Sequence, residues 1–159
     1  MRLKELFNPA DFLIDFAPAD KWEAIGRLMD HLVAAGHVEE ESAPAYKEQV
    51  LERERSMSTG MERGIAIPHA AVDGLSDVAA CIGVVSREEG LAFDSIDTRP
   101  TRLVVLLLIP RAQKLLHIRT LADVARVLGR AGVRDALVAA RSSEEAWHAL
   151  VEGEAVGER

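Results

Sequence analysis

Apolar and polar residues alternate with the period of an α-helix in two segments of the first third of the chain. The spacing predicts a helix over residues 18–35, with Pro18 in its first turn and Gly36 at its C-terminal cap. The recurring apolar positions of this helix are Trp22, Ile25, Met29, Leu32 and Val33. A second helix is predicted over residues 42–56, with Ser42 as its N-cap.

The middle of the chain has the pattern of buried strands. Residues 64–68 form a short apolar run that Pro68 is expected to end. Residues 79–86 and 103–109 are almost wholly apolar, and a shorter strand is possible at residues 91–93. Strands that are apolar on both faces belong to a sheet that helices cover on both sides.

The last part of the chain returns to the helical period. Helices are expected over residues 114–128 and 133–140. Ser142 and Glu145 form a capping-box pattern that opens a final helix ending near Val151. The predicted fold class is therefore α/β: a single domain over residues 1–152, with a mixed β-sheet sandwiched between helices on both faces, and a flexible tail over residues 153–159.

Composition narrows the class of function. The chain has 159 residues, a formal net charge of −7 and a pI near 5.2, which argues against a general nucleic-acid binder. No apolar run approaches the roughly 20 residues of a membrane span, the N-terminus lacks a signal-peptide pattern, and Cys81 is the only cysteine. We therefore expect a cytoplasmic protein with no direct membrane insertion. Several arginines nevertheless gather in the middle of the chain, which hints at an anion-handling centre.

Two histidines are candidates for chemistry. His69 follows an apolar strand and a proline, at the kind of strand end where α/β proteins bind ligands. A neutral imidazole there could act as a nucleophile, although a structural role is also open. His117 lies near the start of the helix over residues 114–128, where a neutral imidazole or a nearby anion is favoured over a positive charge. It could also be a satisfied core histidine.

Three further residues could contact an anion. Arg53 lies on the helix face that Tyr46, Val50 and Met57 would bury, so its guanidinium needs an anionic partner or must reach solvent. The partner could be a carboxylate such as Glu62, or a phosphoryl group, which an arginine fork matches well. Ser58 and Thr59 precede the turn at Gly60 and could donate hydroxyl hydrogen bonds, although such residues are common in turns.

Sequence motifs for nucleotides and metals are absent. The chain contains no GxxxxGK[ST], GxGxxG or HExxH pattern. A zinc site built from His69, His117 and a carboxylate is conceivable, but the spacing does not indicate one. We expect no cofactor and no metal.

Two adjoining motifs carry a resemblance to a known family. Residues 51–60, LERERSMSTG, are followed by residues 64–69, GIAIPH, and together they resemble the enzyme IIA domains of the phosphotransferase system. The match is to the fructose/mannitol class (type 2), which includes the nitrogen-regulatory IIA proteins. The segment from His117 to Ala125 also resembles the second-histidine segment of that family. The chain departs from the family pattern at Glu62, where a glycine is usual.

The resemblance implies a phosphohistidine carrier. His69 would take a phosphoryl group from HPr or a paralogue of HPr, through Nε2, with Arg53 and His117 flanking the group and Ser58 or Thr59 as further ligands. The group would pass to a IIB domain, or its presence would control a regulatory target protein. We favour the regulatory role modestly, because no IIB or membrane domain is present in the sequence.

Other functions remain open. Glu62 favours a degenerate IIA-like module that binds a partner without being phosphorylated. A metal-dependent hydrolase using His69 and His117, or a purely structural interaction domain, would also fit parts of the sequence.

Overall fold

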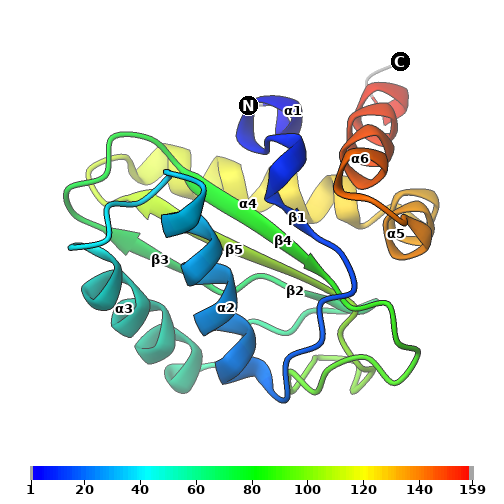
Figure 1. The fold of residues 1–159 in the computed structure, drawn as a ribbon, viewed down its shortest axis with the longest axis horizontal. Helices are drawn as coiled ribbons and strands as arrows, with labels where there is room; N and C mark the ends of the chain where they lie inside the picture. The colour runs from blue at the N-terminus through cyan, green and yellow to red at the C-terminus, as the bar shows by residue number, and fades with distance from the viewer. Residues whose placement is uncertain (1, 158–159) are drawn as a thin grey trace.

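Five strands form one mixed sheet in the computed structural model, which describes residues 2–157. The strands are β1 (Phe12–Leu13), β2 (Ile65–Ala66), β3 (His69–Val72), β4 (Ala79–Val84) and β5 (Leu103–Pro110). The long β4 and β5 pair antiparallel at the centre, β1 is parallel to β4, and both β2 and β3 are parallel to β5 along one edge (Figure 1). The predicted mixed sheet is confirmed.

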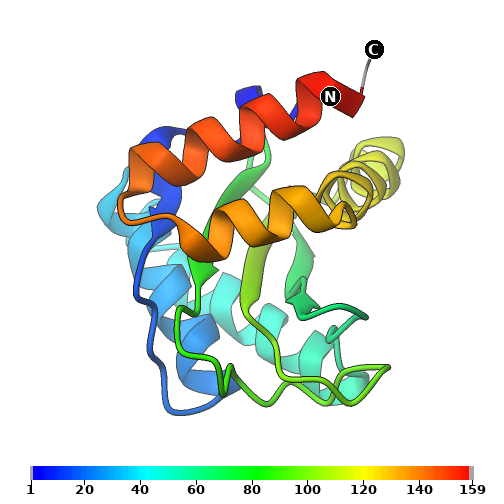
Figure 2. The same ribbon diagram turned by 90° about the vertical axis from the view of Figure 1, so that its right-hand side faces the viewer.

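Helices cover both faces of this sheet (Figure 2). On one face lie α2 (Lys21–Ala34) and α3 (Ala43–Ser56). On the other lie α1 (Leu3–Leu6), α4 (Lys114–Leu128), α5 (Ala131–Ala139) and α6 (Ser143–Gly157). A 3₁₀ turn, η1 (Pro9–Asp11), connects α1 to β1. Within residues 2–157, every helix is too short or too polar to cross a bilayer.

The two cores are built by alternation along the central strands. In β5, Leu103, Val105 and Leu107 enter the core beneath α4, α5 and α6. Val104 and Leu106 alternate with them and enter the core beneath α2 and α3. All eight residues of β5 are buried, as expected for a strand covered on both sides. β2 and β3 are attached to this buried strand, whereas β1 pairs with β4.

The first long helix begins later than the pattern predicted. Asp20, rather than a residue near Pro18, is its N-cap, because the Asp20 carboxylate accepts a hydrogen bond from the amide of Glu23 at 2.8 Å. The second helix begins beside Ser42 as predicted, but the Ser42 side chain makes no capping hydrogen bond. The helix over residues 114–128 has both predicted ends.

The edge strand differs from its prediction in a way that matters for the site. Pro68 does not end the strand: β2 stops at Ala66, and the chain rejoins the same edge of β5 as β3, beginning at His69. Pro68 lacks an N–H, so the ladder is interrupted there. Residues 91–93 form no regular strand; Leu91 makes a single bridge with Thr101.

The last helix continues beyond its predicted end at Val151. It reaches Gly157, so residues 153–157 of the expected tail are helical, while residues 158–159 lie outside the described residues. Glu154 explains part of this extension. Its buried carboxylate accepts the backbone N–H of Leu3 at 2.9 Å from each oxygen, which joins α6 to α1.

Candidate functional site

His69 is the first residue of β3, where the edge strand resumes after Pro68. It pairs with Leu107 of the buried central strand, so its backbone is fixed by the sheet. Its side chain is partly buried, and its Nδ1 lies 2.8 Å from the carbonyl oxygen of Ile67. A carbonyl oxygen can only accept, so Nδ1 carries the proton of the neutral ring. Nε2 then carries the free lone pair.

The surroundings of His69 favour the neutral ring. Its pKa lies below the usual value near 6.5, because burial penalises the charged form and the nearby charges of Arg53 and His117 add to this effect. The hydrogen bond to Ile67 acts in the opposite direction but is outweighed. At neutral pH His69 is therefore a neutral imidazole with an available lone pair on Nε2, which is the state that a nucleophile requires.

His117 lies beside His69, as the sequence suggested. It is in the first turns of α4, and the two rings meet edge to face, with centroids 5.6 Å apart and planes at 89°. Among residues 2–157, the His117 ring has no hydrogen-bond partner, so it is not the satisfied core histidine that was one alternative. Its nitrogens are free to contact a group placed between the rings.

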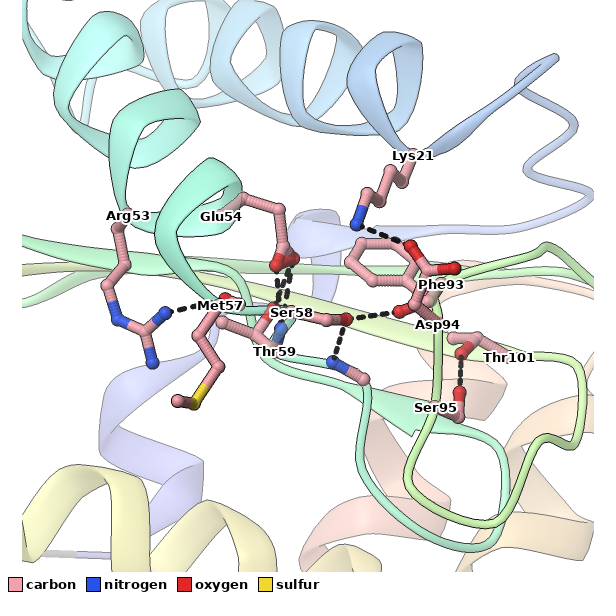
Figure 3. Close-up of polar contacts among 11 residues, drawn as sticks. Lys21, Arg53, Glu54, Met57, Ser58, Thr59, Phe93, Asp94, Ser95 and Thr101 are labelled. Carbon is pink, nitrogen blue, oxygen red and sulfur yellow. Dashed lines mark hydrogen bonds and ion pairs between the residues drawn. The ribbon is translucent and has the colours of Figure 1, made fainter.

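Arg53 completes the cluster from the last turn of α3. One guanidinium nitrogen, Nη1, donates to the carbonyl oxygen of Met57 at 2.7 Å (Figure 3). The predicted alternative partner, Glu62, is not used. A predicted detail was wrong: Met57 is not buried on the helix face but is 69% exposed just past the helix end. Arg53, His69 and His117 together line an open cavity of about 610 Å³.

Ser58 and Thr59 already donate their hydroxyl hydrogens within the protein. The Thr59 hydroxyl donates to the Glu54 carboxylate at 2.6 Å, and the Thr59 amide donates to the same carboxylate at 2.6 Å. The Ser58 hydroxyl donates to the carbonyl of Phe93 and accepts from the amide of Gly60 (Figure 3). The expected donation from these hydroxyls to a bound anion is therefore not available in this geometry. Their visible role is to hold the loop after α3.

The turn between Gly60 and Ile65 forms with Glu62 in place of the family's usual glycine. Arg63 takes the left-handed conformation, with φ of 65°, and Gly64 follows with φ of 78°. The amide of Met61 donates to the carbonyl of Ile65 at 2.7 Å, and Glu62 is exposed at the turn. Glu62 lines neither cavity beside His69. The substitution thus adds a charge on the surface rather than within the site.

A second, more apolar cavity of about 430 Å³ also borders His69, with Arg53 and Asp94 among its lining residues. Met61, Ile67, Ile96, Leu121 and Ala125 supply its apolar lining. Three large apolar side chains are exposed: Ile96, which lines this cavity, at 72%, and Leu115 and Ile118, which flank His117 in α4, at 78% and 66%. Single exposed apolar residues are ordinary, but several beside one reactive group indicate a contact surface. His69 therefore borders a charged cavity and a more apolar one, and Arg53 lines both.

Several residues of the site were not found from the sequence. Glu54 is almost fully buried and anchors Thr59, yet a glutamate next to an arginine in a helix carries no signal of burial. Ile96 reaches the site from a loop, which Lys21 holds through an ion pair of 3.0 Å with Asp94. Arg111 lines the charged cavity and donates to Gln49 at 2.9 Å. Its place just after a buried strand was the available clue.

Comparison with known proteins places the chain in a family. The family model for the phosphoenolpyruvate-dependent sugar phosphotransferase system, EIIA 2, matches residues 5–153. The fructose-specific EIIA component of the phosphotransferase system of Haloferax volcanii is 35% identical over 85% of this chain and 85% of its own length. A nitrogen regulatory protein of Pseudomonas aeruginosa is 29% identical over 96% of each chain.

A solved structure has the same fold. The complex of enzyme IIA mannitol with phosphorylated enzyme IIB mannitol from Escherichia coli contains a chain that matches with a TM-score of 0.76 at 23% identity, covering 92% of this chain and 97% of that one. The model match over nearly the whole chain, together with the 35% identical relative, shows the family. This chain belongs to the type 2 enzyme IIA family of the phosphoenolpyruvate-dependent sugar phosphotransferase system.

Proposed function

We propose that this protein carries a phosphoryl group on Nε2 of His69. The observation that carries the proposal is the hydrogen bond between Nδ1 of His69 and the Ile67 carbonyl, which leaves the lone pair on Nε2. Arg53 and His117 border the same cavity, and both can contact the oxygens of a phosphoryl group. The family supplies the class of reaction, since its members are phosphotransferase components.

The transfer follows from this arrangement. Nε2 of His69 attacks phosphorus as the bond between phosphorus and the donor's nitrogen breaks, and the donor nitrogen recovers its lone pair. The His69 ring becomes positively charged as the new bond forms, and the Ile67 carbonyl stabilises that charge through Nδ1–H. Arg53 stabilises the equatorial oxygens, and His117 donates a hydrogen bond to one of them. No proton has to leave the ring.

The more apolar cavity beside His69 suits a protein donor. A phosphohistidine cannot reach the ring unless its whole carrier docks against this surface. The exposed Ile96, Leu115 and Ile118 provide apolar contact area, while the charged cavity receives the phosphoryl group. We therefore propose HPr or an HPr paralogue as the donor.

The acceptor is either a IIB domain or a regulatory target protein. The mannitol complex shows that a protein of this fold binds a phosphorylated IIB. The Pseudomonas aeruginosa relative is named a nitrogen regulatory protein and matches over 96% of this chain. The Haloferax volcanii relative is named a fructose-specific EIIA component, which supports the transport role. We favour the regulatory role over transport, and we expect the protein to act in the cytoplasm.

The proposal is tested by phosphorylating the purified protein. It is incubated with phosphoenolpyruvate, enzyme I and HPr, and its intact mass is recorded at neutral pH and after mild acid. We expect one acid-labile phosphate on the wild type and none on His69→Gln, which keeps a polar side chain of similar size but has no ring nitrogen to phosphorylate. A folded wild-type protein that gains no phosphate from donors of its native organism would contradict the proposal. That result would favour the unphosphorylated binding module.

A further inference from the structure

Four arginines surround a pocket that is separate from the His69 site. The pocket has a volume of about 390 Å³ and is lined by Arg63, Arg99, Arg102 and Arg134. It lies at the start of β5, beside Leu103, whereas His69 pairs with Leu107 four residues further along that strand. At the rise of a β-strand the two positions are roughly 13 Å apart. The pocket shares no lining residue with the two cavities beside His69.

Two of the guanidinium groups are held close together. Nη1 of Arg63 and Nη1 of Arg134 both donate to the carbonyl oxygen of Gly129, at 3.1 Å and 2.5 Å. Nη1 of Arg134 also donates to the carbonyl oxygen of Leu128. These carbonyls end α4 and carry part of the helix dipole, which favours nearby cations. That partial negative charge of about one half does not balance two full positive charges.

The pocket as a whole is positive in an acidic protein. Arg102 is fixed by hydrogen bonds to the carbonyls of Val85 and Ser86. Four arginines face two aspartates: Asp135 in the lining, and Asp97, which lies 3.9 Å from Arg99. The local formal charge is therefore +2 (four minus two), against −7 for the whole chain. Among residues 2–157, Asp97 is the one carboxylate within ion-pair distance of these four arginines.

The hydrogen bonds from the arginines to backbone carbonyls also hold the guanidinium groups in place before a ligand binds. Arg63, Arg102 and Arg134 are each fixed by a backbone carbonyl and retain unused N–H donors. An arginine that is already held loses less conformational freedom when it binds an anion, and its planar fork matches a phosphate. The remaining wall is apolar, with Pro100, Leu103 and Val138 beside the cationic rim.

We propose that this arginine pocket binds a small organic phosphate, with the phosphate between Arg63 and Arg134 and the carbon skeleton against Leu103 and Val138. The volume is within the range of small-molecule sites. An apolar wall suits a flat ring better than a polyhydroxylated skeleton, so a nucleoside monophosphate is the favoured ligand. The chain has no glycine-rich nucleotide motif, so the proposed recognition depends on the arginine side chains of the pocket.

The test is a titration of the full-length ¹⁵N-labelled protein with adenosine monophosphate, with affinities measured in parallel by calorimetry. We expect saturable binding, with the largest amide shifts at Gly64 and Gly129. Glucose 6-phosphate and inorganic phosphate separate a sugar-phosphate or phosphate-only site from a nucleotide site, and adenosine, which has no phosphate, should not bind. Retained binding in His69→Gln would show that the ligand is not in the phosphotransfer site.

Charge-removing variants complete the test. Arg134→Gln and Arg63→Gln should each weaken binding roughly tenfold or more, the loss expected for a charged hydrogen bond. Arg27→Gln is the matched control, because it removes the same charge from an exposed ion pair on α2. Arg99→Gln, whose side chain is 74% exposed, replaces any variant that fails to fold. Absence of binding in the folded wild type, shifts centred on His69, or an equal loss in Arg27→Gln would overturn the proposal.

Discussion

Replacing Glu54 should destabilise the protein and release the loop beside Arg53. Glu54 is 2% exposed, and its carboxylate accepts hydrogen bonds from two donors of Thr59, the amide and the hydroxyl. Glu54→Ala leaves both donors buried without a partner. Each unsatisfied buried donor costs about 1–3 kcal/mol, so the free energy of unfolding should fall by about 2–6 kcal/mol. For a chain of this size, each kcal/mol corresponds to roughly 2–4 °C in Tm.

A double-mutant cycle isolates the interaction. Thr59→Val keeps the amide bond to Glu54 and removes only the hydroxyl bond, so it should cost about 1–3 kcal/mol in the wild type and much less in Glu54→Ala. Urea denaturation followed by tryptophan fluorescence measures all four free energies. If Glu54→Ala stays within about 0.5 kcal/mol of the wild type, or if Thr59→Val costs the same in both backgrounds, the buried carboxylate does not hold the loop.

Three further outcomes are expected. Arg53→Ala should slow phosphorylation of His69 by roughly 10³-fold, with Arg53→Lys intermediate in a rapid-quench assay; a near-normal rate would remove Arg53 from the mechanism. The pKa of His69 in the fold lies below its value of about 6.5 in the unfolded chain, so the unfolded chain binds more protons at pH values between the two. The free energy of unfolding should therefore fall as the pH drops below about 6.5, and His69→Gln should flatten this decline in urea titrations. Ile118→Glu should raise the KM for the phosphorylated donor with Tm unchanged, whereas Trp22→Glu, also exposed but on α2, should not.

Features that depend on local patterning were predictable. Both ends of the helix over residues 114–128 and the buried central strand follow directly from hydrophobic periodicity. Arg53, His69 and His117 line one cavity, as expected. The residue patterns suggested each of them separately, and only the resemblance to the family placed them in one site. A pattern along the chain can say which face of an element is buried, but not which side chain it meets.

Features that depend on distant contacts were not predictable. No sequence pattern links His31 and His37 to Asp11, yet Nε2 of each lies within 3.0 Å of the same carboxylate oxygen of Asp11, which is fully buried. Helix α6 extends past Val151 because Glu154 meets the amide of Leu3, at the other end of the chain. No spacing rule relates such residues, because they are distant in the sequence and meet only through the tertiary fold.

The interruption of the edge strand between β2 and β3 determines the position of the His69 ring. If Pro68 had ended the strand, His69 would lie on a loop and the Ile67 carbonyl would have no fixed relation to its ring. Because the chain returns to β5 at His69, the ring is held against a carbonyl two residues earlier. Burial, Arg53 and His117 keep the free ring neutral, while the same carbonyl favours the positive charge that appears when Nε2 forms a bond. In the proposed reaction, the break in the strand thus supplies both the available lone pair on Nε2 and the support for the charged product.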